Sequence, residues 1–142
     1  SKGTGLAIYK VHFDVCDDDG NDPVAAAATG QFRAGIISFS GAPAAAVGSA
    51  SLSTNVLNAS NDLMIAGVNF AAGGTAAGDP AQFTFLEPSK EVPYVVVRDQ
   101  VALMISVITA MSAGASVKVR LECAQVTLDQ STLNQLLRTQ TV

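Results

Sequence analysis

The chain has 142 residues, of which 49% are hydrophobic and only 14% are charged, and its net charge is −4. The acidic pI of 4.6 and the eight scattered Lys and Arg residues exclude the clustered cationic surface that nucleic-acid binding requires. The longest apolar run, residues 101–108, is interrupted only by Ser106 and is shorter than the roughly 18 residues of a membrane helix. The length predicts one domain, residues 1–142. The charge and the short apolar run predict neither nucleic acid nor a membrane as a partner.

The low charge content also bears on assembly. An ordinary soluble domain carries about 25% charged residues, whereas Ala, Gly, Ser, Thr, Asn and Gln must form most of the surface here. Such a weakly polar surface is typical of a protein that buries much of its outside against copies of itself or a larger assembly. We therefore expect a stable homo-oligomer, with a trimer favoured over a dimer.

The first predicted element is a half-buried strand over residues 6–15, because apolar residues alternate along it. One face carries Ala7, Tyr9, Val11, Phe13 and Val15, and the opposite face carries Leu6, Ile8, Lys10, His12 and Asp14. An Asp- and Gly-rich turn follows at residues 17–23.

This acidic turn is the best candidate for an ion site. Enough carboxylate and amide oxygens for calcium gather in it and just before it, at Asp14, Asp17, Asp18, Asp19, Asn21 and Asp22. The EF-hand spacing fails, since placing Gly20 at its sixth position puts Val15 at the first. We interpret the segment as a solvated hairpin turn, with an irregular calcium site as the alternative.

The middle of the chain predicts four further strands, separated by two segments of small residues. The strands are expected at residues 31–40, 51–57, 63–70 and 82–86, with a kink or bulge at Gly67. The small-residue segments are 41–50 and 71–81. Either they pack flat against a neighbouring subunit or they form surface loops, and the sequence leaves both interpretations open.

The last third predicts strands at residues 94–97, 101–109 and 117–128, with 111–115 as a hairpin loop. Lys118 and Arg120 lie at strand spacing and indicate a solvated face. A terminal helix of one or two turns is expected, capped by Asp129 or Ser131. Its apolar residues, Leu133, Leu136 and Leu137, would dock onto its own sheet or onto a partner.

Seven or eight short strands predict an all-β, single-domain β-sandwich or jelly roll, with a β-barrel as the second choice.

Catalytic signals are weak throughout the sequence. His12 is the single imidazole, so a two-His metal site within one chain is excluded. No Ser stands in a G-x-S-x-G pattern, and the glycine-rich stretches lack the spacing of phosphate loops. His12 is interpreted as an ordinary strand residue, with a pH-sensitive pairing to Asp14 as the alternative. We therefore predict no enzyme, no catalytic residue, no cofactor and no bound metal.

The two cysteines are far apart in the sequence and have no neighbours at metal-ligand spacing. Cys16 and Cys123 are predicted to be reduced and buried. The first residues do not have the pattern of a signal peptide, so we expect synthesis in a cytoplasm.

In general character the chain resembles small β-structured virion proteins of tailed bacteriophages, above all capsid decoration (cement) proteins. The resemblance rests on the abundance of Ala, Gly, Ser and Thr, the lack of a catalytic set and the apolar terminal strands 101–109 and 117–128. It implies homotrimers that sit at threefold positions of a virion lattice and clamp neighbouring subunits of a major capsid protein, after synthesis in the host cytoplasm.

A jelly-roll subunit that forms the shell itself is a close variant of this interpretation. A second hypothesis is a β-sandwich binding module, such as a fibre tip or adhesin that recognises a carbohydrate or a cell surface. Sugar-binding platforms favour Trp and Tyr, and this chain has no Trp and only Tyr9 and Tyr94. An enzyme is the least favoured class.

Overall fold

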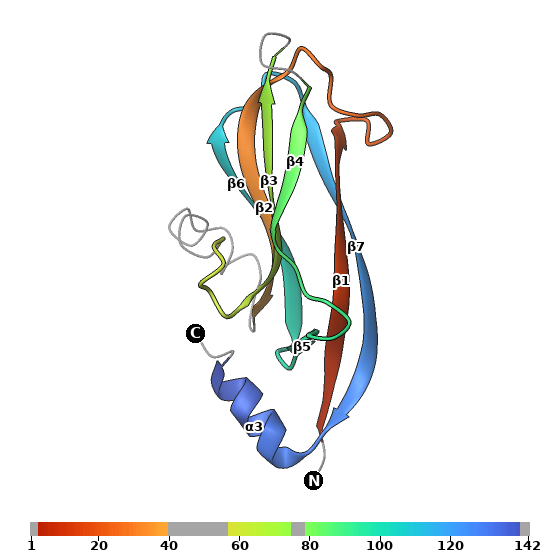
Figure 1. Cartoon of the computed structure of the whole chain (residues 1–142), viewed down its shortest axis with the longest axis vertical. Helices are drawn as coiled ribbons and strands as arrows, with labels where there is room; N and C mark the ends of the chain where they lie inside the picture. Colours follow the sequence, from red (N-terminus) through yellow and green to blue (C-terminus); the bar gives the residue numbers. More distant parts are fainter. Residues whose placement is uncertain (1–2, 40–56, 75–78, 140–142) are drawn as a thin grey trace.

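In the part of the chain that the structure describes, seven antiparallel strands form two sheets that pack face to face (Figure 1). The computed structural model describes residues 3–39, 57–74 and 79–139. Its elements are β1 (Gly3–Asp17), β2 (Thr29–Phe39), β3 (Met64–Gly73), β4 (Ala81–Leu86), β5 (Tyr94–Val96), β6 (Gln100–Thr109), β7 (Ala115–Leu128) and α3 (Gln130–Thr139). One sheet has the order β5-β1-β7 and the other β4-β3-β2-β6. The predicted all-β sandwich with a terminal helix is therefore confirmed.

The main core lies between the two sheets, where alternate residues of each strand point inward. Phe32 and Phe70 stack with their ring centroids 5.2 Å apart. Phe13 and Val117 of the other sheet pack against them. Each fully buried large apolar side chain contributes roughly 1.5–3 kcal/mol, so this contact between the sheets is a major source of stability.

A bulge in β1 corrects the predicted faces of the first strand. The register of β1 against β7 shifts between Ile8 and Lys10, which places Tyr9 at the bulge. Ile8, expected on the increasingly polar face, is fully buried in one cluster with Val11. Strict alternation failed here because one inserted residue moves the following side chains to the opposite face.

The link between β6 and β7 is not the predicted hairpin loop. β6 pairs with β2 and β7 pairs with β1, so residues 110–114 connect the two sheets rather than two neighbouring strands. The Ser112 N–H donates to the Thr29 carbonyl, and the Ser112 hydroxyl oxygen accepts the Thr29 N–H, both at 2.8 Å. These bonds hold the link across one end of the sandwich.

A smaller core covers the outer face of the four-stranded sheet, where Ile37, Leu57, Met64 and Met104 are buried together. The pairing of β3 with β4 is irregular between Gly67 and Val68, so the predicted kink or bulge at Gly67 is confirmed.

The small-residue segments are described only in part. The predicted strand at residues 51–57 lies outside the described residues except for its last position, and so does the whole of segment 41–50. In segment 71–81, Ala71 to Gly73 continue β3 beyond its predicted end at residue 70, and Ala81 begins β4.

The terminal helix begins after Asp129, which is the cap. Its carboxylate oxygen Oδ1 accepts the Thr132 N–H at 2.7 Å, and this bond lowers the pKa of Asp129. Leu133 packs against Gly3 at the start of β1, so the helix docks onto its own sheet. Figure 1 shows α3 at the end of the molecule where the N-terminus lies.

Tyr94 anchors the short strand β5 and makes stability sensitive to high pH. Its hydroxyl donates to the Asp62 carbonyl oxygen at 2.7 Å, and burial, with a smaller effect from the Asp62 charge, raises its pKa from 10.0 to about 12. Because the unfolded chain ionises first, the stabilisation from this proton is complete below pH 10 and is lost as pH rises toward 12.

We therefore expect Tyr94 to stay un-ionised near pH 11 in the folded protein. A Tyr9→Phe variant leaves Tyr94 as the only tyrosine, so absorbance at 295 nm reports its ionisation alone, with the urea-unfolded chain as the control. Ionisation near pH 10 in a sample that is still folded by circular dichroism would contradict this assignment.

Candidate interaction surface

One side of the sandwich is open, because the three-stranded sheet leaves the inner face of β6 uncovered. Within the described residues, Leu103, Ile105 and Val107 are 37%, 46% and 60% exposed. Their register partners on β2 are, in the same order, Ile36, Ala34 and Phe32, all of which are buried. The three β6 side chains therefore point toward the interior, but no strand among the described residues lies opposite them.

A groove of about 380 Å³ marks the upper part of this opening. Phe32 lines it together with Ile105 and Val107 of β6. Met111 from the link and Val117 from β7 also contribute apolar side chains to the lining. The groove is thus an exposed continuation of the main core, and its filling would extend that core.

Both strands that border the opening are edge strands. β6 ends the four-stranded sheet and β7 ends the three-stranded sheet, so neither has a second neighbour among the described residues. Natural edge strands are commonly protected by charges or proline. β6, with the sequence QVALMISVIT, contains neither. An uncharged, apolar edge strand favours pairing with another strand.

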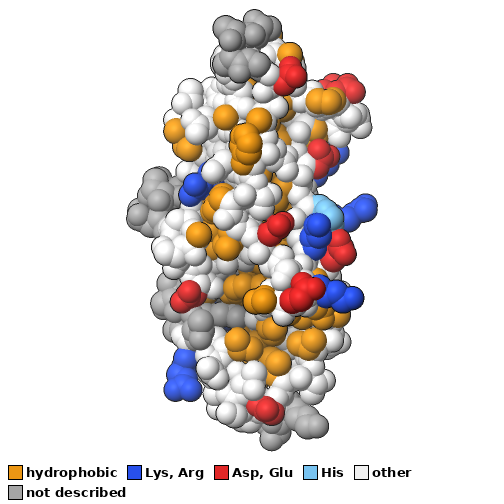
Figure 2. Space-filling view, viewed as in Figure 1, with side chains coloured by type: hydrophobic (Ala, Val, Ile, Leu, Met, Phe, Trp, Pro, Cys, Tyr) orange, Lys and Arg blue, Asp and Glu red, His pale blue; other side chains and the backbone are white. Residues whose placement is uncertain are grey.

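The outer face of β1 and β7 is charged, in contrast to the opening. In the register of these strands Lys10 is beside Glu122, and Asp14 is opposite Lys118. His12 Nε2 lies 2.5 Å from Glu122 Oε2, so the histidine pairs with Glu122 rather than with Asp14. The two side chains are 45% and 58% exposed, and such surface pairs contribute little stability. Figure 2 shows these charges gathered along one side of the molecule.

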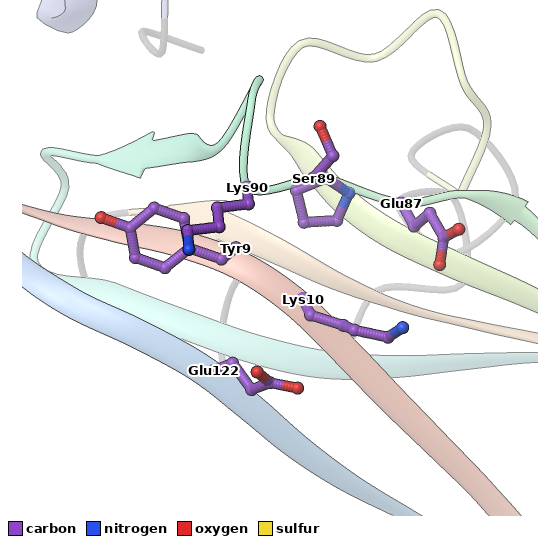
Figure 3. A pocket seen from close by; sticks show the side chains of 7 residues that line it. Tyr9, Lys10, Glu87, Ser89, Lys90 and Glu122 are labelled. Atoms are coloured by element: carbon purple, nitrogen blue, oxygen red, sulfur yellow. The ribbon is translucent and has the colours of Figure 1, made fainter.

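A shallow depression lies beside this charged face (Figure 3). Its lining consists of Tyr9, Lys10, Glu87, Pro88, Ser89, Lys90 and Glu122. The labelled side chains fan out rather than converge on one point (Figure 3). The depression is thus an open surface feature with charged side chains in its lining.

The acidic turn closes on itself. Asp17 Oδ1 accepts N–H groups from Gly20 at 3.0 Å and from Asn21 and Asp22 at 3.3 Å. Lys118 donates to the Gly20 carbonyl. An isolated antiparallel β-bridge pairs the backbones of Cys16 and Pro23 where the turn begins and ends. Within the described ranges no three His, Cys, Asp or Glu side chains are grouped as metal ligands. The hydrogen bonds of Asp17 and Lys118 thus give the segment the geometry of a closed turn.

An Asp17→Ala variant should lower the free energy of unfolding by about 1 kcal/mol, because the Asn21 and Asp22 N–H groups lose the carboxylate oxygen to which they donate. Chemical denaturation measures this loss, and Asp19→Ala in the same exposed turn is the matched control. A rise in melting temperature of the unmodified protein on addition of millimolar calcium would contradict the interpretation.

The cysteine prediction is half wrong. Both thiols are free, and Cys16 is buried as expected, with its Sγ 3.7 Å from the Ser116 carbonyl oxygen. Cys123 is exposed. It lies opposite Ile8 on the edge strand β7, and an edge strand has less cover than β1 at the centre of the sheet.

The sequence does not distinguish the opening from a core. The length of the apolar run at residues 101–108 matches a strand that crosses a core, but a fully buried strand and an uncovered edge strand have the same apolar composition. The absence of any charge between Gln100 and Thr109 was the available signal, but a central strand gives it too.

No helix in the described part of the chain is long and apolar enough to span a membrane. No protein-family model matches the chain, and no curated protein or solved structure matches it significantly.

Proposed function

We propose that this protein is a structural subunit that acts through protein–protein contacts, associating with copies of itself and decorating a larger shell as virion cement proteins do. The observation that supports the proposal most directly is the uncovered apolar face of β6, with Leu103, Ile105 and Val107 exposed side by side. Adjacent exposed apolar side chains on an edge strand mark an interaction surface.

Burial of the apolar β6 face is a favourable term in assembly. A standard interface buries about 800 Å² per partner. At roughly 25 cal/mol per Å² of apolar area, covering the β6 face contributes enough to offset part of the entropy that association costs.

The charged face of β1 and β7 is on the other side of its sheet from the core and stays available for a second partner, such as a major capsid protein.

The carbohydrate-binding alternative gains less support. Of the two tyrosines, Tyr94 has its hydroxyl bound to the Asp62 carbonyl oxygen. Tyr9 is the one aromatic residue in the lining of the shallow depression, whereas sugar platforms use exposed aromatic faces.

Co-sedimentation with empty shells of the cognate virus tests the decoration role. We expect saturable binding that protects the shells against thermal disruption, and we expect Lys118→Glu with Arg120→Glu to weaken it. The matched control is Lys90→Glu, which changes an exposed lysine outside β1 and β7. Shells that neither bind the protein nor gain stability from it would contradict this role.

A further inference from the structure

We infer that the occupant of the open side is a second copy of this chain, related by a twofold axis parallel to the strands, with β6 of each copy paired to β7 of the other. This inference rests on the proposed self-association and makes it specific: it names the two edges, their relative direction and the stoichiometry.

The shape of the molecule carries the inference. The four-stranded sheet extends one strand, β6, beyond the cover of the three-stranded sheet. A twofold axis parallel to the strands turns the second copy over, so that its projecting β6 enters the place beside β7 where a fourth strand would lie. The same operation places the first copy's β6 beside the partner's β7. Each sheet then continues through both copies with seven strands, four from one and three from the other.

Strand direction agrees with this arrangement. β6 and β7 run in opposite directions along the long axis of the molecule (Figure 1). A twofold axis parallel to the strands leaves direction unchanged, so β6 meets the partner's β7 in the antiparallel sense. Antiparallel pairing satisfies the outward-pointing N–H and C=O groups of both edges.

The side chains fit as well. On the inner side, the exposed apolar residues of one β6 face those of the other, which closes a continuous core from Leu103, Ile105 and Val107. On the outer side, the charges of β7 at Lys118 and Arg120 lie next to the uncharged β6, so no like charges are brought together.

Other symmetric pairings fit less well. Pairing β7 with β7 in one sheet brings the two projecting β6 strands into collision, because each would lie above the other copy's β7. Pairing β6 with β6 leaves the inner faces of both strands without an opposing layer. Only the β6–β7 exchange fills the opening in both copies at once.

The contact is large enough for a stable dimer. The ten residues of β6 span about 33 Å at roughly 3.3 Å per residue, and two sheet layers are roughly 20 Å deep. The resulting face is on the order of 660 Å² per copy before side chains interdigitate, close to the roughly 800 Å² of a standard interface.

The register of the pairing follows from the same axis, which preserves height along the strands. Val107 of β6 and Val117 of β7 both line the groove, so these parts of the two strands lie at the same end of the opening. With these two residues as the reference pair, counting along antiparallel strands brings Val101 beside Cys123, on the same inward-facing parity. A Val101→Cys substitution should thus form a disulfide with Cys123 of the second copy.

The first experiment combines mass measurement with substitution. Light scattering of the unmodified protein should give a dimer, and Ile105→Glu should give a folded monomer with an unchanged circular dichroism spectrum. Phe83→Glu, at a 63% exposed position on the opposite edge strand β4, is the matched control and should stay dimeric. Val107→Lys, at a 60% exposed position, is the second variant in case Ile105→Glu does not fold. If folded Ile105→Glu or Val107→Lys kept the dimeric mass, the inference would be overturned.

The second experiment tests the register. Under mild oxidation Val101→Cys should run as a disulfide-linked dimer on a non-reducing gel. Ala102→Cys, whose side chain points to the opposite face, should not, and neither should Val101→Cys combined with Cys123→Ser. Equal cross-linking of Val101→Cys and Ala102→Cys would overturn the pairing. A trimeric mass would also overturn it while leaving the proposed self-association intact, whereas a monomer at all concentrations would contradict both.

Discussion

An Ile36→Asp variant is expected not to fold. Ile36 is 4% exposed and lies at the centre of the cluster that joins the two sheets. A buried carboxylate without a partner costs several kcal/mol, which is a large part of the roughly 5–15 kcal/mol that stabilises an ordinary domain. Circular dichroism and the loss of a cooperative thermal transition measure the effect.

Leu103→Asp is the matched control, and we expect the opposite outcome. Leu103 on β6 is the register partner of Ile36 and points to the same face, yet it is 37% exposed. Its carboxylate reaches water, so the variant should fold and remain soluble, with its self-association weakened. If Leu103→Asp were as fully unfolded as Ile36→Asp, the inner face of β6 would belong to the core of the single chain. The description of this side of the sandwich as open would then be wrong.

The second large effect is expected from Gly67→Val. A Cβ at Gly67 would lie 2.3 Å from Met64 Cε and 2.4 Å from Phe85 Cζ, both closer than van der Waals contact allows. The Met64 methyl is able to move, but the Phe85 ring has Arg33 over its face, with the guanidinium carbon 4.1 Å from the ring centroid. We expect a loss of about 3 kcal/mol, at the upper end of the range for overpacked cores, measured by urea denaturation.

Gly73→Val in the same strand is the control for the Gly67 prediction. Gly73 is exposed at the end of β3, so a side chain there meets little and the stability change should stay within about 0.5 kcal/mol. In the Gly67→Val background, Phe85→Ala should recover part of the loss, because it removes the atoms that clash. Additive losses in the double variant would contradict a direct clash.

Much of the fold was predictable from local pattern. Alternation placed the strands that became β1, β2, β6 and β7 within a few residues of their observed bounds, because a side-chain period of two is set by strand geometry itself. The helix cap at Asp129 and the irregularity at Gly67 were also predictable, because a capping side chain and a glycine act on the backbone next to them.

The errors arise where a long-range contact decides. One bulged residue, Tyr9, moved Ile8 into the core. The link after β6 looks like a hairpin loop, but whether its two strands pair or enter different sheets depends on partners far away in the sequence. The same holds for the surface: Ile105 and Ile36 are alike in composition and spacing, and only the number of strands in the opposing sheet makes one exposed and the other buried.

The central claim is that this chain works as an assembled structural subunit through its open side. The most direct test is the solution mass of the unmodified protein by light scattering across a dilution series from high to low micromolar concentration. The inferred exchange of β6 and β7 predicts a constant mass of twice the 14.5 kDa chain. A mass of 14.5 kDa at every concentration would show that the apolar face of β6 is tolerated in water, and would contradict the claim.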